Sequence, residues 1–173
     1  MVMVIILGPR RPPRIRLTNA AGARQWFDNH PVEALVSHTQ APLDDTPRAI
    51  SVRITTDGDA QAQARLRHVR FGIFDPQAAF KTEFRQRIMG ELLQFGVNHF
   101  PLFGHGRQLR ITVTFCVLRI RKGIDNMLKL IMDVLEGPVY GNDANVTFIV
   151  ASKIQAIDPD EASTDITVDE VWL

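Results

Sequence analysis

The sequence has few of the features that mark secreted, membrane or zinc proteins. Cys116 is the only cysteine, which excludes an internal disulfide and favours a reducing compartment. No apolar run approaches the roughly 18–20 residues that a helix needs to cross a bilayer. The apolar residues 1–7 are short and lead into Gly-Pro-Arg-Arg, so we expect a strand there and no signal peptide. The five histidines show no metal-ligand spacing, which argues against a zinc site.

Several common functional signatures are also missing. We find no internal repeat, no P-loop, no dinucleotide fingerprint and no nucleophile with a hydrolase signature. A length of 173 residues, 45% hydrophobic content and a mean hydropathy of -0.04 are typical of one soluble globular domain. We expect a cytoplasmic protein in a bacterial or phage setting, while a nuclear or organellar setting stays open.

A net charge of +1 excludes a strong overall excess of either sign, but the charges are unevenly distributed. From Asp158 onward all charged residues are acidic, whereas basic residues form three groups earlier in the chain. These groups are Arg10, Arg11, Arg14 and Arg16; Arg65, Arg67 and Arg70; and Arg119, Arg121 and Lys122. A neutral total is therefore compatible with one basic face that binds phosphates. Scattered solubilising arginines are the alternative.

Hydrophobic periodicity predicts a series of strands and helices. Alternating apolar residues predict strands near 50–55, 109–120, 146–151 and 164–171. Asp75 as N-cap, Pro76 at the first helical position and Gly96 as a stop bound a helix whose core stripe is Phe80, Phe84, Ile88, Leu92 and Phe95. Residues 57–70 read as a loop. The order predicts an α+β domain, in which helices pack on a single mixed β-sheet.

The first 48 residues are harder to assign. Prolines punctuate them too often for a long helix or a central strand, although Trp26-Phe27 and the segment 34–36 could pack onto the domain. We divide the chain into an N-terminal extension, residues 1–48, and a main domain, residues 49–173.

The most informative segment is a helix pattern that starts at Asp125. Asp125, Lys129 and Asp133 sit at i, i+4 and i+8, so on a helix they form one polar stripe about 80° wide. Nearly all residues between them are apolar, which predicts a helix buried on several sides. Gly137, with Pro138 after it, is the expected stop.

A second carboxylate, Asp143, lies within reach of this helix. Residues 125–136 rise roughly 18 Å as helix, and an extended segment 138–143 can travel back about 17–20 Å. We therefore expect Asp143 to return to the level of Asp125, where two carboxylates can hold a hard divalent cation. Lys129 would stabilise negative charge on an attacked phosphate, and Asn126 would orient a carboxylate or phosphate oxygen. Taken separately, an Asp–Lys pair and an Asn-Asp turn are ordinary surface features.

The joint spacing is more specific. It reads DN-x2-K-x3-D-x-L-x-G, then four residues, then N-D-x2-V, and it closely resembles the RusA family of Holliday-junction resolvases. The resemblance implies a homodimeric, Mg2+- or Mn2+-dependent endodeoxyribonuclease that cuts branched DNA, with Asp125 and Asp143 as catalytic metal ligands and Lys129 as catalytic cation. It also implies a DNA-contacting basic loop after the first strand of the domain. The expected DNA-binding residues are Arg65, Arg67, Arg70, Arg119, Arg121, Lys122 and Asn126.

The chain departs from the family pattern at two places. Gly123 stands where the family has an Asp, and Asn142 stands where a second consecutive acid is usual. Losing one of about three carboxylates should weaken metal binding unless another acid substitutes. Asp133, Asp57 and Asp59 are the candidates by position, although we interpret Asp133 as a support for the helix.

Two alternatives follow from these departures. A protein of the same fold could bind branched DNA with weakened or absent cleavage, or the polar stripe could be a subunit contact unrelated to DNA.

Overall fold

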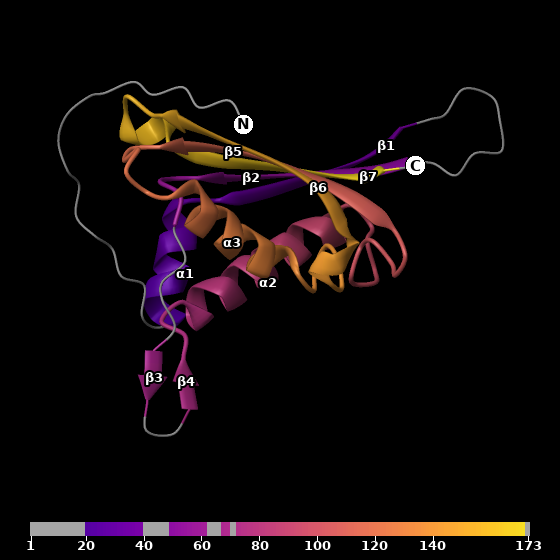
Figure 1. Cartoon of the computed structure of the whole chain (residues 1–173), viewed down its shortest axis with the longest axis horizontal. Coiled ribbons are helices and arrows are strands. Elements are labelled where there is room, and N and C mark those ends of the chain that lie inside the picture. The colour runs from indigo at the N-terminus through magenta and orange to yellow at the C-terminus, as the bar shows by residue number, and fades with distance from the viewer. Residues whose placement is uncertain (1–19, 40–48, 62–66, 70–71, 172–173) are drawn as a thin grey trace.

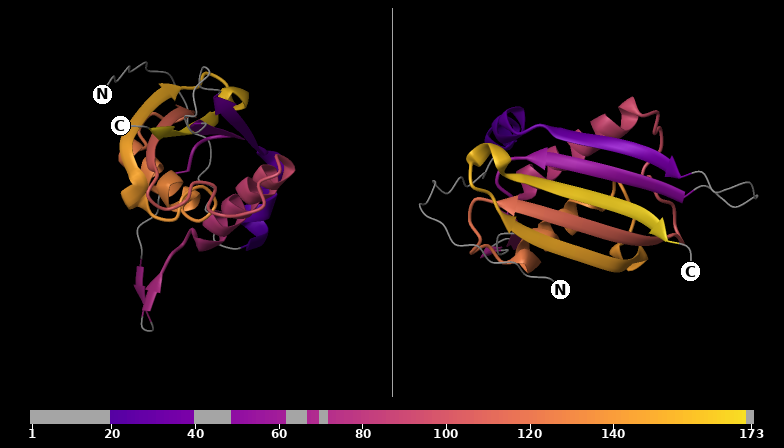
Figure 2. Two further views of the ribbon diagram at one scale, coloured as in Figure 1. Left: turned by 90° about the vertical axis from the view of Figure 1, so that its right-hand side faces the viewer. Right: turned by 90° about the horizontal axis from the view of Figure 1, so that it is seen from above.

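The computed structural model describes residues 20–39, 49–61, 67–69 and 72–171 (Figure 1). Its centre is a five-stranded mixed sheet, which is seen face-on in the right-hand view of Figure 2. The strands lie in the order β1 (Val32–Thr39), β2 (Ala49–Asp57), β7 (Ser163–Val171), β5 (Gln108–Val117) and β6 (Val146–Gln155). All neighbours are antiparallel except β5 and β6, which are parallel. Among the described strands, β1 and β6 form the two edges.

Three helices cover one face of this sheet (Figures 1 and 2). They are α1 (Ala20–Asn29), α2 (Ala78–Gln94) and α3 (Ile124–Leu135). None of the helices in the described part of the chain is long and apolar enough to span a membrane. The single mixed sheet with helices packed on it confirms the predicted α+β class.

The alternation seen in the sequence explains which face is covered. Ile111, Val113 and Phe115 of β5 are fully buried under the helices, while the residues between them are partly exposed on the other face. Ile166 and Val168 of β7 continue the same buried layer. The four strands predicted from periodicity are all present. β5 and β7 show the period-two burial expected of strands with one solvated face, whereas the edge strand β6 does not.

The N-terminal segment belongs to the same core, so the predicted division at residues 48 and 49 does not separate two folding units. β1 pairs with β2 along its whole length, and Trp26 and Phe27 of α1 are buried against Phe80 and other residues of α2. β1 is an edge strand and α1 is short, as the prolines around them require. Residues 1–19, including the expected first strand and the basic cluster at 10–16, lie outside the described residues.

α2 differs from its prediction at both ends. The helix begins at Ala78, and Asp75 caps the turn before it by accepting a hydrogen bond from the Gln77 backbone nitrogen at 2.8 Å. At the other end Phe95 is the C-cap and is 47% exposed, so its assignment to the core stripe was wrong. Gly96 follows with a φ of 81°, which confirms the predicted stop.

The segment predicted as a loop at 57–70 contains a strand. β3 (Arg67–Val69) pairs with β4 (Gly72–Phe74) in a hairpin that projects from the body of the molecule (Figure 1).

Candidate active site

α3 carries the motif as predicted. Five apolar side chains of the helix are buried, namely Met127, Leu130, Ile131, Val134 and Leu135. Asp125, Asn126 and Lys129 are exposed near its beginning. Gly137, with a φ of 104°, lies just beyond its C-cap, as expected. The first two turns of α3 therefore present an acid, an amide and an amine to solvent on a rigid support.

The place of the missing family carboxylate is partly filled by Asp125 itself. A Cβ atom added to Gly123 would lie 2.5 Å from the Asp125 Oδ1 atom. Gly123 is the N-cap of α3, and no side chain caps the helix there. The Asp125 carboxylate thus lies over the backbone before the helix, in the favourable field of the helix N-terminus.

Two lysines fix the loop that leads into α3. Lys122 Nζ lies 2.7 Å from Asp59 Oδ2 and also donates to the Ala60 carbonyl, while Asp59 Oδ1 accepts from the Leu118 backbone nitrogen at 3.0 Å. On the other side, Lys153 of β6 donates to the carbonyls of Ile120 and Lys122. Lys122 was predicted to contact DNA, but in this structure its ammonium group is bonded to Asp59 and Ala60.

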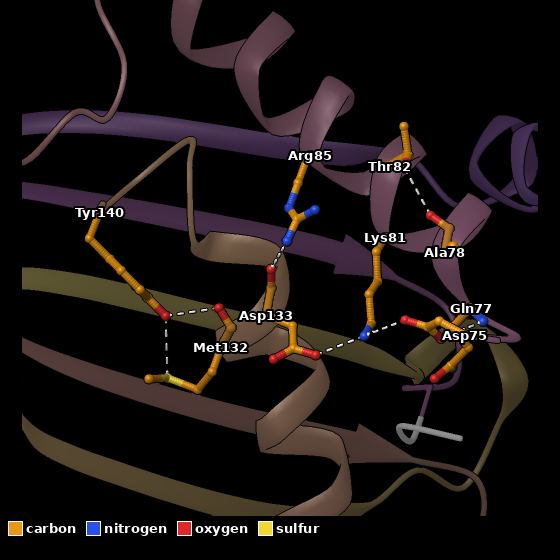
Figure 3. A network of polar contacts seen from close by, with 9 residues as sticks. All are labelled: Asp75, Gln77, Ala78, Lys81, Thr82, Arg85, Met132, Asp133 and Tyr140. Carbon is orange, nitrogen blue, oxygen red and sulfur yellow. Dashed lines mark hydrogen bonds and ion pairs between the residues drawn. The ribbon is translucent and has the colours of Figure 1, made fainter. Parts of the chain in front are cut away.

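Asp133 belongs to a partly buried ionic network between α2 and α3 (Figure 3). Lys81 Nζ lies 2.9 Å from Asp75 Oδ2 and 2.7 Å from Asp133 Oδ2, and Arg85 donates to the Asp133 carbonyl. Burial alone would lower the pKa of the Lys81 ammonium, but its hydrogen bonds to Asp133 and Asp75 outweigh burial and raise it. The interpretation of Asp133 as a support for the helix is confirmed by these contacts.

Tyr140 packs against the last turns of α3, beside this network. It is fully buried, and its hydroxyl donates to the Met132 carbonyl at 2.9 Å (Figure 3). Burial raises the pKa of this hydroxyl, so Tyr140 stays protonated and serves the packing of the helix end.

Asp143 lies in η1 (Asp143–Asn145), a single 3-10 turn just before β6. The Asn142 side chain caps this turn by accepting from the Ala144 backbone nitrogen at 2.7 Å. Asp143 is exposed. The Asn-Asp pair of the motif thus has a local structural basis, because Asn142 caps the turn that presents Asp143.

The structure does not bring Asp125 and Asp143 together within one chain, so that geometric expectation was wrong. α3 follows the end of β5 at Val117, whereas Asp143 precedes Val146, which pairs with Leu109 at the start of β5. These two ends of the strand pair are about 26 Å apart. In Figure 1 the segment before β6 lies near the end of α3, away from the start of that helix.

The cause lies in the segment between α3 and η1. It does not extend back along the helix but folds into a compact turn, in which Gly137 N donates to the Tyr140 carbonyl at 2.8 Å. Phe103 N donates to the Val139 carbonyl at 2.8 Å and fixes this turn on the loop before β5. Because β6 is parallel to β5, the chain must return to the level of the start of β5 before β6 begins, and this places η1 at that end.

The candidates for a third metal ligand are mostly engaged elsewhere. Asp133 pairs with Lys81 and Asp59 pairs with Lys122, while Asp57 is exposed at the end of β2. Within the ranges that the structure describes, no group of three His, Cys, Asp or Glu residues is placed to hold a metal ion. The donor chemistry suits a hard divalent cation, but the single chain does not assemble the donors.

The predicted DNA-binding residues fall into two sets. Arg119, Arg121 and Asn126 flank the start of α3, with Arg121 and Asn126 exposed and Arg119 partly buried. Arg65 and Arg70 lie outside the described residues, as does the side chain of Arg67. The hairpin that carries Arg67 nevertheless projects from the body, which suits an arm (Figure 1).

Two lysines were missed by sequence reasoning. Lys81 lies within the apolar stripe of α2 and Lys153 within an apolar strand, so the signal was a single charge at a position that the periodicity marks for burial. A lysine can occupy a buried position only if hydrogen-bond or ionic partners surround its ammonium group. Asp75 is near Lys81 in the sequence, but Asp133 and the carbonyls of Ile120 and Lys122 lie far along the chain from the lysines that they bind, so these partners could not be predicted.

Comparison with known proteins agrees with the motif. Residues 58–168, more than half of the chain, match the family described as Endodeoxyribonuclease RusA. Comparison with curated proteins gives no match. The match covers the α3 motif, the loop that Lys122 and Lys153 fix, and all of β6, and the chain therefore belongs to the RusA endodeoxyribonuclease family.

Proposed function

We propose that this protein is a divalent-metal-dependent endodeoxyribonuclease that resolves Holliday junctions or other branched DNA as a homodimer. Family membership supports the nuclease activity. The observation that carries the rest is the position of Asp125 and Asp143, two exposed acids of the family motif near opposite ends of the β5–β6 strand pair. We also propose a cytoplasmic setting, which suits the free thiol of Cys116.

The edge strand β6 supports a second copy as the partner. It has ten residues with neither proline nor glycine, and its one charged side chain, Lys153, is used within its own chain. Among the described residues, five of the eight exposed large apolar side chains follow one another from 148 to 157, each between 46% and 88% exposed: Phe148, Ile149, Val150, Ile154 and Ile157. A long apolar edge without protection is a template for pairing with another strand.

Pairing of β6 with β6 of a second copy would assemble the site. A two-fold axis makes the pair antiparallel, so the start of one β6 lies beside the end of the other. Asp143 of each chain precedes Val146 and would thereby approach the partner's loop 118–123, which leads to Asp125. The dimer would contain two such composite sites, as two nicks in opposing strands require.

Each composite site would hold the ion with Asp125 of one chain and Asp143 of the other. When bound, a Mg2+ or Mn2+ ion supplies activation of a water and neutralisation of the attacked phosphate. Lys129, exposed one turn after Asp125, would stabilise charge on that phosphate. Arg121 and Asn126 would contact the DNA backbone beside it.

Cleavage of a labelled synthetic four-way junction, with and without Mn2+, tests this function. The unmodified protein should nick the junction only with the metal, and Asp125→Asn should abolish nicking while leaving the unfolding midpoint unchanged. Glu33→Gln is the matched control, because Glu33 is exposed on β1 at the opposite edge of the sheet. Junction cleavage by Asp125→Asn at the unmodified rate would show that the site is wrong.

A second function is favoured by Gly123. With one carboxylate fewer than the family pattern, the protein would bind branched DNA without cutting it. Salt-sensitive junction binding without nicking at any Mn2+ concentration would establish this alternative. Absence of both binding and nicking would instead support a subunit contact for the polar stripe.

A further inference from the structure

The Lys153 ammonium joins the edge strand β6 to the loop before α3. Its Nζ atom lies 2.7 Å from the Ile120 carbonyl oxygen and 2.6 Å from the Lys122 carbonyl oxygen. Lys153 lies beside Phe115 in the register of the parallel pair, so its side chain is on the helix-covered face of the sheet. The second of these carbonyls belongs to the peptide bond that links Lys122 to Gly123.

These contacts fix the loop from the side opposite the Lys122–Asp59 pair. Two carbonyl oxygens that converge on one point repel each other, and a shared ammonium converts that repulsion into two charge-assisted hydrogen bonds. Lys122 holds the other side of the loop through Asp59 and Ala60. The backbone from Leu118 to Gly123 is thereby attached both to β6 and to the loop after β2.

We propose that Lys153 is a positioning residue, which sets the loop 118–123 and so the Asp125 carboxylate relative to β6. This inference rests on the proposed function, in which β6 also fixes the position of the partner's Asp143. Lys153 would then fix the distance between Asp125 of its own chain and Asp143 of the other copy. The loop 118–123 sets the position of Asp125, and the pairing of the two β6 strands sets the position of Asp143.

A positioning role and a purely electrostatic role predict opposite changes in metal affinity. The Lys153 charge repels a divalent cation, so removing it should strengthen Mn2+ binding if charge alone matters. If Lys153 positions Asp125, removing it should weaken Mn2+ binding, about tenfold by the usual effect of residues that orient metal ligands. Lys153→Met removes the charge and keeps a long side chain, so it separates the two roles.

The test titrates the full-length protein with Mn2+ alone and follows bound ion by electron paramagnetic resonance. Hydrogen–deuterium exchange of the backbone amides at 118–126 is measured on the same variants without metal. Lys153→Met should bind Mn2+ about tenfold more weakly and exchange faster in this segment. Ser152→Ala, on the same strand with its hydroxyl bonded to Thr114 on the other face, should do neither.

Lys153→Arg keeps donors and charge, so it should restore most of the Mn2+ affinity and protection. If Lys153→Met does not unfold cooperatively, Lys153→Gln takes its place, since it retains a donor for one carbonyl. Unchanged or stronger Mn2+ binding with unchanged exchange would overturn the proposal, as would loss of junction affinity alone, which marks a phosphate contact. Failure of the proposed function is recognised separately, because Asp125→Asn would then leave Mn2+ binding unaffected.

Discussion

The ionic network between α2 and α3 yields a stability prediction whose size follows from burial. Lys81→Met removes the lysine from two carboxylates, Asp75 and Asp133. Breaking a fully buried ion pair costs about 3–5 kcal/mol. The Lys81 side chain is only 10% exposed, but those of Asp75 and Asp133 are 25% and 34% exposed, so water compensates part of the loss. We expect a loss of about 2 kcal/mol in unfolding free energy, or roughly 4–8 °C in Tm for a chain of this size.

Urea unfolding followed by circular dichroism measures this loss, and Arg87→Met is the matched control on the same helix. Arg87 also has two acidic partners, Asp28 at 2.6 Å and Glu83 at 3.0 Å, but its side chain is 40% exposed. Its replacement should cost less than about 1 kcal/mol. Equal losses for the two variants would refute the reasoning that burial sets the energy of the Lys81 network.

Three further predictions follow from the same structure. Burial raises the pKa of Asp75, but hydrogen bonds from Lys81 and Gln77 outweigh it and hold the pKa below its ordinary value. A carboxyl group with a lowered pKa contributes stability that is complete above its unfolded-state pKa of about 4 and is lost as the pH falls through its folded-state pKa. The difference in unfolding free energy between wild type and Lys81→Met should therefore be constant from about pH 5 to 9 and shrink below about pH 4. Val150→Lys should convert the proposed dimer to monomer in light scattering, whereas Leu93→Lys, a similarly exposed site on α2, should not. Gly123→Asp should raise Mn2+ affinity and junction cleavage, since the added Cβ meets only a movable carboxylate oxygen at 2.5 Å, and an unchanged Mn2+ affinity would contradict this.

Local patterns predicted most of the fold. The alternation in β5 and the four-and-three spacing of Phe80, Phe84, Ile88 and Leu92 reflect burial on one face, which depends only on neighbours in sequence. Helix ends were less accurate, because Phe95 follows the last helical residue and points to solvent, although its spacing fits the stripe. The sequence could not show that α1 and β1 join the core, since that depends on pairing with β2.

The exposure of Asp125 and Lys129 on α3 followed from the sequence, but the separation of Asp125 from Asp143 did not. Spacing along α3 placed Asp125 and Lys129 correctly on an exposed stripe, because helix periodicity is local. The path from α3 to Asp143 was misjudged, since it depends on the turn at Gly137 and on contacts with Phe103 far earlier in the chain. The length of the segment 138–143 limits how far it can extend, but its actual path depends on hydrogen bonds to distant parts of the chain.

Complementation between two inactive chains tests the central claim most directly. Asp125→Asn and Asp143→Asn chains, co-expressed with different tags and purified as the mixed dimer, contain one composite site with both substitutions and one with neither. We predict that each variant alone is inactive and that the mixed dimer regains metal-dependent nicking of a four-way junction, one strand at a time. A mixed dimer as inactive as its parents would contradict a site shared between two copies of the chain.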